Sequence, residues 1–440
     1  MSFFGPTSPP GLEETSTPLL RRAFHHARVV GSFAVVQGIV QIIGFLAGIL
    51  IVRSLDQREY AYFTIANTMQ GTLNVLADIG ISIGLVSIGG RVWQDRHRFG
   101  QLITTARQLR KKLALAAILV VTPVLYFMLA KNGAPATYSF LLIAFVLAGL
   151  AVQLGLGVLS VIPRLRADLT KIQKIDLTGA IARLLILVVV AYLFLNAGLA
   201  VAIGSAVLLL QYLMLRNYAA RVVDLRAPAN EEDRSAMLGF IKNQAPNAIF
   251  FCFQGQITVL LIGFFAHSAA AVAEVGALGR LAMIFTVLSN LLTNVFAPAF
   301  ARCHTPEKLR WIYGSMVGAV AAFSLLVLAT AAFFPHEFLL VLGNQYAHLN
   351  HELLLMVAGS VLMAVNGTLW VLNASKAWIA GSWLYIPLTL AAQIALIPFI
   401  DFSSVASVLM FNLLSAVPNF FLNVVLSFRG FRSLPAAAAT

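Results

Sequence analysis

Charged residues are scarce in this 440-residue sequence, at 11% of the chain, and acidic ones are the scarcest, with 17 Asp and Glu against 30 Lys and Arg. Hydrophobic residues make up 60% of the chain. An ordinary soluble domain is about one quarter charged. This composition therefore excludes a conventional soluble globular protein and indicates a chain that lies mostly in lipid.

Sequence patterns that carry enzymatic or metal chemistry are also missing. Two cysteines, Cys252 and Cys303, give no disulfide framework. The chain has no Gly-rich phosphate loop, no nucleophile elbow and no paired carboxylates, so we predict no catalytic residues and no enzyme activity. His348 and His351 are spaced i, i+3 in an outer segment, but no cysteine joins them. We therefore expect no metal site and no cofactor.

Twelve long apolar runs fill most of the sequence. About 20 apolar residues span the hydrocarbon core as a helix, and a helix satisfies its own backbone hydrogen bonds in lipid. We predict an all-α polytopic membrane protein with 12 transmembrane helices, arranged as two six-helix lobes around a central cavity. The predicted spans are 30–52, 61–88, 113–130, 138–161, 177–195, 197–216, 243–265, 276–299, 311–334, 351–374, 378–400 and 404–427.

The longest predicted polar connection, 217–242, divides the runs six and six. Because six is even, two duplicated halves would be related by an axis along the membrane normal. A plain even-numbered bundle without a repeat is the alternative. The predicted units are an N-terminal tail (1–29), a first lobe (30–216), a linker (217–242), a second lobe (243–427) and a C-terminal tail (428–440).

Lys and Arg lie almost entirely on one side of the predicted spans. Twenty-five fall on the side of the termini, including seven in the predicted loop 89–112, and only Arg53, Arg58 and Lys131 fall on the other. By the positive-inside rule, both termini should be cytoplasmic. We predict a multi-pass protein of the cell inner membrane. The net charge of +13 needs no nucleic acid to explain it.

Amide side chains recur at helical spacing within several runs. They are Asn67, Gln70 and Asn74 in the second span, Asn247 and Gln254 in the seventh, Asn290 and Asn294 in the eighth, and Asn412, Asn419 and Asn423 in the twelfth. Interhelical hydrogen bonding, which contributes about 0.6 kcal/mol per bond, is one interpretation. A hydrated central cavity is the other, and the number of amides in spans 1, 2, 7 and 8 favours it.

Three ionisable residues lie deep in the predicted spans, where a charge is expensive and usually functional. Arg280 follows the small residues 276–279 and can offer a planar fork to a phosphate; alternatively it snorkels outward or pairs with Asp78 or Glu274. Arg183 is a second candidate for substrate binding, unless its stem snorkels to the inner headgroups. Asp78 is a candidate for ion coupling, or simply the partner of an arginine.

Two stretches resemble a known family. The segment from Gly31 to Arg91, which contains IVRSLDQREYAYFTIANTMQGTLNVLADIGISIGL, is similar to the opening of Wzx-type polysaccharide flippases. These belong to the multidrug/oligosaccharidyl-lipid/polysaccharide superfamily. The segment from Pro246 to Arg302 looks like the start of that family's second lobe.

This resemblance implies alternating access that moves an undecaprenyl-diphosphate-linked oligosaccharide across the inner membrane for surface polysaccharide biosynthesis. It implies that a cavity cation, best represented here by Arg280, engages the diphosphate or acidic sugars. Membrane lipids are expected partners, glycan polymerase and export proteins are candidate partners, and the protein is expected to act as a monomer. H⁺ or Na⁺ is the candidate coupling ion, although acidic residues within the spans are few.

Two other functions remain open at this point. A multidrug or metabolite antiporter of the same superfamily would use cation coupling through embedded acids, for which only Asp78 qualifies. A membrane glycan polymerase or ligase would need catalytic groups in a sizeable outer loop, which the sequence does not contain.

Overall fold

Helices make up almost all of the computed structural model, which describes residues 17–166, 168–266, 268–291, 300, 303 and 305–433. The helices of the first half are α1 (Thr17–Ser54), α2 (Gln57–Asp78), α3 (Ile81–Val92), α4 (Arg96–Lys131), α5 (Ala136–Leu159), α6 (Val161–Leu165), α7 (Leu169–Leu193) and α8 (Ala197–Val222). Those of the second half are α9 (Glu231–Phe265), α10 (Ala269–Leu281), α11 (Ile284–Leu291), α13 (Pro306–Phe333), α14 (Pro335–Leu342), α15 (Asn350–Ser375), α16 (Tyr385–Leu396) and α17 (Val405–Arg432).

Eleven helical segments of the described residues are long and apolar enough to cross a membrane, and the bent pair α2–α3 brings the number to 12. The expectation of an all-helical, multi-pass membrane protein is therefore confirmed. The last part of the predicted span 276–299 lies outside the described residues.

The predicted second span is not one straight helix. The chain bends by 44° between α2 and α3. Gly80 lies at the bend with φ +70°, and a Cβ there would come within 2.8 Å of the Phe240 carbonyl oxygen. Only glycine fits both the left-handed backbone and this close approach of α9. The bend thus holds the start of α9 against the end of α2.

The predicted loop 89–112 is mostly helical. The side chain of Asp95 accepts hydrogen bonds from the backbone N–H groups of His97 and Arg98, and this N-cap starts α4 at Arg96. Phe99, Leu102, Ile103, Ala106, Leu109 and Arg110 are buried on one face of the helix. Because the apolar positions keep helical spacing from Phe99 onward, α4 continues inward without a break.

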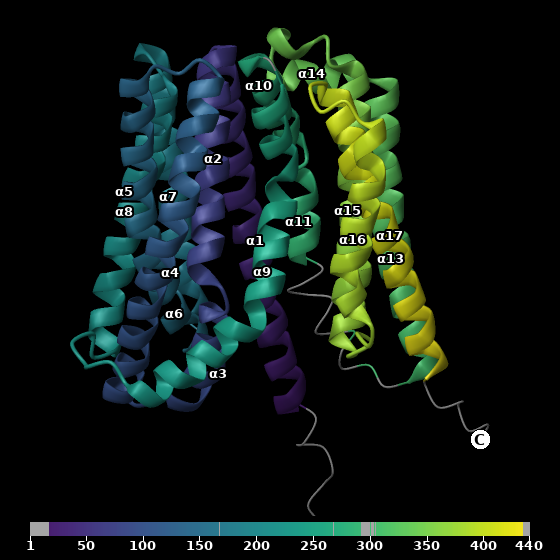
Figure 1. The fold of residues 1–440 in the computed structure, drawn as a ribbon. Helices are drawn as coiled ribbons and strands as arrows, with labels where there is room; N and C mark the ends of the chain where they lie inside the picture. Colours follow the sequence, from purple (N-terminus) through teal and green to yellow (C-terminus); the bar gives the residue numbers. More distant parts are fainter. Residues whose placement is uncertain are drawn as a thin grey trace, which may run out of the picture.

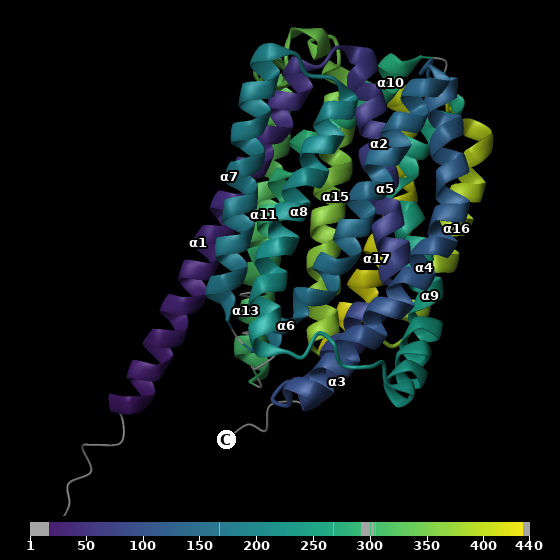
Figure 2. The ribbon, with the colours of Figure 1, turned by 90° about the vertical axis from the view of Figure 1, so that its left-hand side faces the viewer.

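The helices form two groups joined through α9 and α10 (Figure 1). In the first, α5 packs on α8, α2 on α4, and α1 on α7, the last two lying side by side in Figure 2. In the second, α15 packs on α13 and α17, and α16 on α17. Helices α9 and α10 belong to the second half of the chain, yet both pack on α2. Only residues 223–230 separate α8 from α9, so the non-helical connection is shorter than the expected linker.

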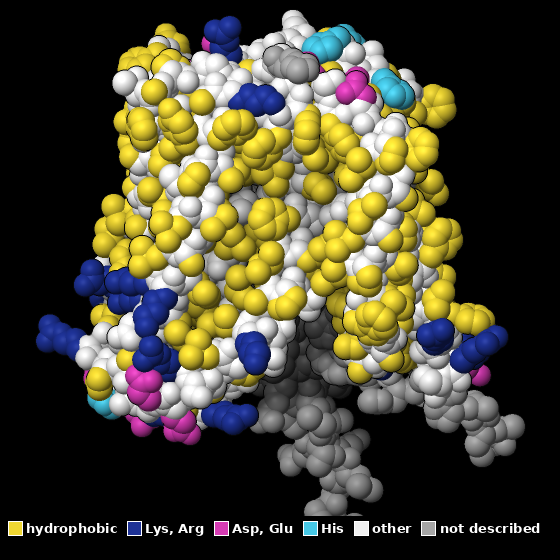
Figure 3. All heavy atoms as spheres, viewed as in Figure 1, with side chains coloured by type: hydrophobic (Ala, Val, Ile, Leu, Met, Phe, Trp, Pro, Cys, Tyr) yellow, Lys and Arg dark blue, Asp and Glu magenta, His cyan; other side chains and the backbone are white. Residues whose placement is uncertain are grey.

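Charged side chains gather at the ends of the molecule, and hydrophobic ones cover the band between them (Figure 3). Large apolar side chains face outward within the band, among them Leu119 at 77% exposure and Leu326 at 65%. Lipid is the solvent that suits such a surface. We call the end that carries Arg96 and Arg98, drawn at the bottom of Figure 3, the basic end.

At the end opposite the basic end, the two groups of helices are joined directly. The Arg53 guanidinium, at the end of α1, donates to the carbonyl oxygens of Leu340 and Val341 in α14, the latter at 3.0 Å. Gln345 donates to the Val52 carbonyl oxygen at 3.1 Å. These contacts close this end of the molecule in the present conformation.

Candidate functional site

Arg280 lies in α10 where the two halves of the chain meet. Its Nε is 3.3 Å from the hydroxyl oxygen of Tyr60, and its guanidinium carbon lies 5.7 Å from the centre of the Phe63 ring. A Cβ at Gly48 of α1 would be 3.4 Å from the Arg280 Cδ. Two aromatic rings of α2 and a glycine of α1 therefore hold the arginine stem in place. The periodicity of the sequence did not reveal the two aromatic residues, Tyr60 and Phe63.

Arg183 of α7 is near enough to Arg280 to feel the charge of its guanidinium, and no direct contact between the two side chains is found among the described residues. Its Nε is buried and has no hydrogen-bond partner among the described residues. Helix α1 packs against both α7 and α10, so it lies beside both arginines. The structure thus brings together two residues that the sequence suggested separately.

Neither arginine forms an ion pair with a carboxylate in the described part of the chain. Glu274, which the sequence offered as a partner of Arg280, instead contacts His348, with 3.1 Å between Oε1 and Nε2. Leaving two like charges unpaired in a largely apolar interior costs free energy. A group with at least two anionic oxygens would relieve this cost by bridging the two forks.

Asp78 pairs with Arg110, which the sequence analysis had placed in a loop. Arg110 is 3% exposed; its Nη1 lies 3.5 Å from Asp78 Oδ1, and its Nη2 donates to Asn74 Oδ1 at 3.1 Å. The Ser82 hydroxyl donates to the same carboxylate at 2.9 Å. The pair favours the structural alternative for Asp78 over ion coupling. The apolar periodicity of α4 was the signal that could have placed Arg110 inside.

A cavity of about 230 Å³ beside this pair contains further charge of both signs. It is lined in part by Asn74, Arg110, Arg164 and Asp176. Asp176 accepts a hydrogen bond of 3.1 Å from Gln37 and also feels the charge of Arg164. Since each arginine has a carboxylate nearby, this cavity offers no excess of positive charge to an anion.

The predicted amides of α2 and α9 have different surroundings. Asn67 and Asn247 are exposed, and no hydrogen bond of their side chains is found among the described residues. Gln70 packs against Gly149, whose added Cβ would be 2.5 Å from the Gln70 Nε2. Gln254 accepts from Gln393 at 2.8 Å and links α9 to α16. Asn290 belongs to α11, and Asn294 lies outside the described residues.

The amides of α17 connect helices within the second group. Asn419 donates to the Thr389 hydroxyl, and Asn423 donates to Asn366 Oδ1. The Ser427 hydroxyl continues the network by donating to Asn373 Oδ1 at 2.8 Å. For this helix the interpretation as interhelical hydrogen bonding fits best.

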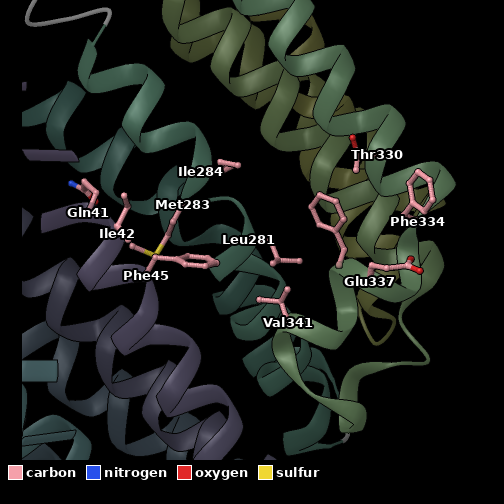
Figure 4. A pocket seen from close by; sticks show the side chains of 11 residues that line it. Gln41, Ile42, Phe45, Leu281, Met283, Ile284, Thr330, Phe334, Glu337 and Val341 are labelled. Atoms are coloured by element: carbon pink, nitrogen blue, oxygen red, sulfur yellow. The ribbon is translucent and has the colours of Figure 1, made fainter. Parts of the chain in front are cut away.

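An apolar cavity of about 660 Å³ opens between α1, the α10–α11 junction and the α13–α14 corner. Figure 4 shows Ile42 and Phe45 on α1, Leu281 and Ile284 at the junction, and Phe334 near the corner. Leu281 directly follows Arg280 in the chain. The residue next to Arg280 in the chain therefore lines this apolar groove.

The described residues contain no group of three or more His, Cys, Asp or Glu side chains placed to hold a metal ion. His348 is engaged with Glu274, as described above.

Comparison with known proteins gives a family and a fold. The sequence profile of the family described as "Polysaccharide biosynthesis protein" matches residues 50–350, more than half of the chain. No curated protein matches the sequence.

Several solved structures match over nearly the whole length. The lipid II flippase MurJ in an inward closed conformation has a TM-score of 0.71 at 8% identity, covering 91% of this chain and 89% of that one. An inward-facing MATE-family multidrug resistance transporter of the MOP superfamily has a TM-score of 0.62 at 14% identity, with coverages of 92% and 100%. The eukaryotic MATE transporter AtDTX14 has a TM-score of 0.60 at 13% identity, with coverages of 94% and 99%. At such identities these likenesses show the fold alone.

Proposed function

Because the chain belongs to the polysaccharide biosynthesis protein family and has the fold of MOP-superfamily transporters, we propose that it is a flippase. Its proposed substrate is an undecaprenyl-diphosphate-linked oligosaccharide, which it moves across the bacterial inner membrane by alternating access. The polar head of such a lipid cannot cross hydrocarbon unaided. The protein must therefore offer a polar binding site inside the membrane and a lateral groove for the tail.

The main observation behind the proposal is that two neighbouring arginines lack a carboxylate counter-ion among the described residues. Arg183 and Arg280 lie near each other without a carboxylate among the described residues, and Tyr60 orients one of them. A diphosphate presents several anionic oxygens to two such forks, and charge-assisted hydrogen bonds are the strong ones. A cationic drug, the substrate of a multidrug antiporter, would be repelled by the same pair.

The apolar cavity beside Arg280 supports the same substrate. Its walls are Ile42, Phe45, Leu281 and their neighbours, and it lies between α1 and the second group of helices. A polyprenyl chain gains free energy by burying apolar surface, whether in lipid or in such a groove. We place the first part of the tail there, with the diphosphate at the arginines.

The distribution of basic residues supports an orientation with the basic end in the cytoplasm. Lys and Arg side chains crowd that end in Figure 3, as the positive-inside rule requires of cytoplasmic loops. In this orientation the end closed by Arg53 and Gln345 faces outward. The present conformation is then one that receives substrate from the inner leaflet.

A strain that lacks the chromosomal gene tests the proposal. Deletion should abolish surface polysaccharide and cause the lipid-linked oligosaccharide to accumulate, and plasmid-borne wild-type protein should restore export. Arg280→Gln and Arg183→Gln should fail to restore it at equal membrane levels, whereas Lys131→Gln, which removes a basic residue at the outer end, should succeed.

The same strain separates the alternative functions. Normal polysaccharide together with drug sensitivity in the deletion strain would contradict the flippase and support an antiporter. A glycan changed covalently by purified protein in detergent would instead indicate a polymerase or ligase.

A further inference from the structure

Two cavities with both polar and apolar lining residues run along α15 in the second group of helices and meet at Met363. The first, of about 300 Å³, is lined by Ala282 and Phe285 near Arg280, and by Ser360 and Asn412. The second, of about 330 Å³, lies between α9, α15, α16 and α17. We call the second one the aromatic cavity; its defining residues are Asn247, Asn366, Trp370, Trp383, Tyr385 and Asn423. Because Met363 lines both, the two cavities are neighbours, and together they lead from the residues just after Arg280 to the aromatic cavity.

Aromatic rings form one side of this cavity. Trp370 is 39% exposed and Trp383 is 73% exposed, so much of their surface is uncovered. The Tyr385 ring lies 5.1 Å from the Phe251 ring, centre to centre, which fixes its position. Rigid amphipathic rings of this kind stack against the C–H faces of sugars, which are apolar while the rims of the same sugars are polar.

Amide groups form the other side. Asn366 and Asn423 are 4% and 1% exposed, and Asn423 donates to Asn366 Oδ1, which fixes the orientation of the Asn366 amide. The Asn366 Nδ2 makes no hydrogen bond among the described residues, and neither does the exposed amide of Asn247. Both amides are therefore available to hydroxyl groups, for which an amide supplies a donor and an acceptor.

Among the described residues that line the aromatic cavity there is no Asp, Glu, Lys or Arg. The charged part of a lipid-linked sugar is thus matched at Arg183 and Arg280, and an uncharged polar part is matched here. Tryptophans also occur at the membrane–water interface, where they anchor a protein in the bilayer. That role does not require buried amides of fixed orientation beside the rings, as are found here.

We infer that the aromatic cavity is a subsite for uncharged sugar rings of the transported oligosaccharide, with Trp370 and Trp383 as stacking platforms and Asn247 and Asn366 as hydroxyl partners. This inference rests on the proposed flippase function. It assigns the glycan to the second group of helices and the diphosphate to the junction with the first. The subsite would select substrates by the sugars that lie several positions from the diphosphate.

Binding to purified protein in detergent tests the inference with two probes. One is undecaprenyl diphosphate without sugar, and the other is the lipid-linked oligosaccharide extracted from the deletion strain. The variants are Trp370→Leu and Trp383→Leu; the second replaces a side chain that is 73% exposed, so it removes little packing. Trp311→Leu is the matched control, because Trp311 is 71% exposed on α13 and lines neither cavity.

Each cavity variant should bind the oligosaccharide lipid about fivefold or more weakly while its dissociation constant for undecaprenyl diphosphate stays unchanged. The control should bind both probes like the wild type. Equal affinity of wild type and both cavity variants for the oligosaccharide lipid would overturn the subsite, as would an equal loss for both probes. The flippase proposal fails separately, if Arg280→Gln leaves the affinity for both probes intact or if the deletion strain accumulates no lipid-linked oligosaccharide.

Discussion

Arginines lie within the membrane-spanning helices in two regions of this protein, and their surroundings differ. Arg110, in the first group of helices, has Asp78 as an ion-pair partner and Asn74 as a hydrogen-bond acceptor. Arg183 and Arg280 have each other as neighbours and no carboxylate within ion-pair distance among the described residues. The first arrangement contains its own counter-ion, whereas the second leaves positive charge to be neutralised by something else.

The difference separates structural from functional charge in a bilayer protein. A buried ion pair adds little to the net stability of the fold, because removing both ions from water costs free energy. Removing only one of the two partners, however, is strongly destabilising. Two like charges without a counter-ion do not stabilise the fold, and for this reason we propose that an anion binds beside them. Burial alone does not distinguish the two, because Arg110 and Arg183 both have buried guanidinium nitrogens.

Removing the unpaired charges should produce the largest functional effect. The double variant Arg183→Gln/Arg280→Gln should reduce glycan export by about 100-fold or more, because two charge-assisted hydrogen-bonding groups contribute about 1.5–3 kcal/mol each. Its thermal stability should equal or exceed that of the wild type, since a repulsion is removed. Export is measured as surface polysaccharide per unit of membrane protein. A large drop in the melting temperature of the double variant would contradict the claim that these two arginines, unlike Arg110, do not stabilise the fold.

Breaking the paired arginine should act on stability instead. Arg110→Leu leaves Asp78 without its counter-ion, and because Asp78 is 30% exposed we expect a loss of about 2 kcal/mol, below the 3–5 kcal/mol of a fully buried pair. Differential scanning fluorimetry of the purified protein measures it. Adding Asp78→Asn should recover part of the loss, while a variant of normal stability that fails to export would argue for a role of Arg110 in transport.

A carboxylate introduced beside Arg183 would give this arginine the kind of counter-ion that Arg110 already has, and so tests the difference between the two regions directly. Arg280→Glu should give a folded, inactive protein that is stabilised by about 1 kcal/mol relative to Arg280→Gln, as expected for a partly exposed ion pair. The shift in melting temperature between the two variants reports this gain. Identical melting temperatures would mean that the two positions are not close enough to interact.

The smallest effect concerns an ion pair outside the membrane. His97 and then the backbone N–H of Arg226 hydrogen-bond to Asp224 and lower the pKa of its carboxyl below the ordinary 3.8. A lowered folded-state pKa stabilises the protein above the unfolded value, and this contribution is lost as the pH falls through the folded value. Melting temperatures of Asp224→Asn and wild type should therefore differ slightly at pH 6 and converge below pH 3.8. A constant difference across this range would contradict the assignment.

Much of the fold follows from the sequence because lipid imposes a simple requirement on the backbone. Apolar runs of sufficient length must become helices, so the number and type of elements were predictable. The break between α2 and α3 was not, since it depends on contact between Gly80 and the Phe240 carbonyl, which are distant in sequence. The start of α4 was missed because charged residues near its N-cap, Asp95, look like a loop when only hydropathy is considered.

The candidate site was predictable only in part for the same reason. Arg183 and Arg280 stood out as charges in apolar runs, but their proximity depends on how α7 and α10 pack about α1. The sequence pattern marked Asn247 as an amide within a span but did not predict the aromatic cavity, because Trp370, Trp383 and Asn247 come from separate segments. Spacing identifies a residue's face on its own helix and says nothing of the partner across the bundle.

The most direct test of the account is the affinity of the purified protein for undecaprenyl diphosphate, measured by isothermal titration for wild type and for Arg183→Gln/Arg280→Gln. If the unpaired arginines hold the diphosphate, the dissociation constant should rise about 100-fold or more in the double variant, which corresponds to about 2.8 kcal/mol, and should stay unchanged in Lys131→Gln. Equal affinity of the double variant and the wild type would show that the diphosphate binds elsewhere.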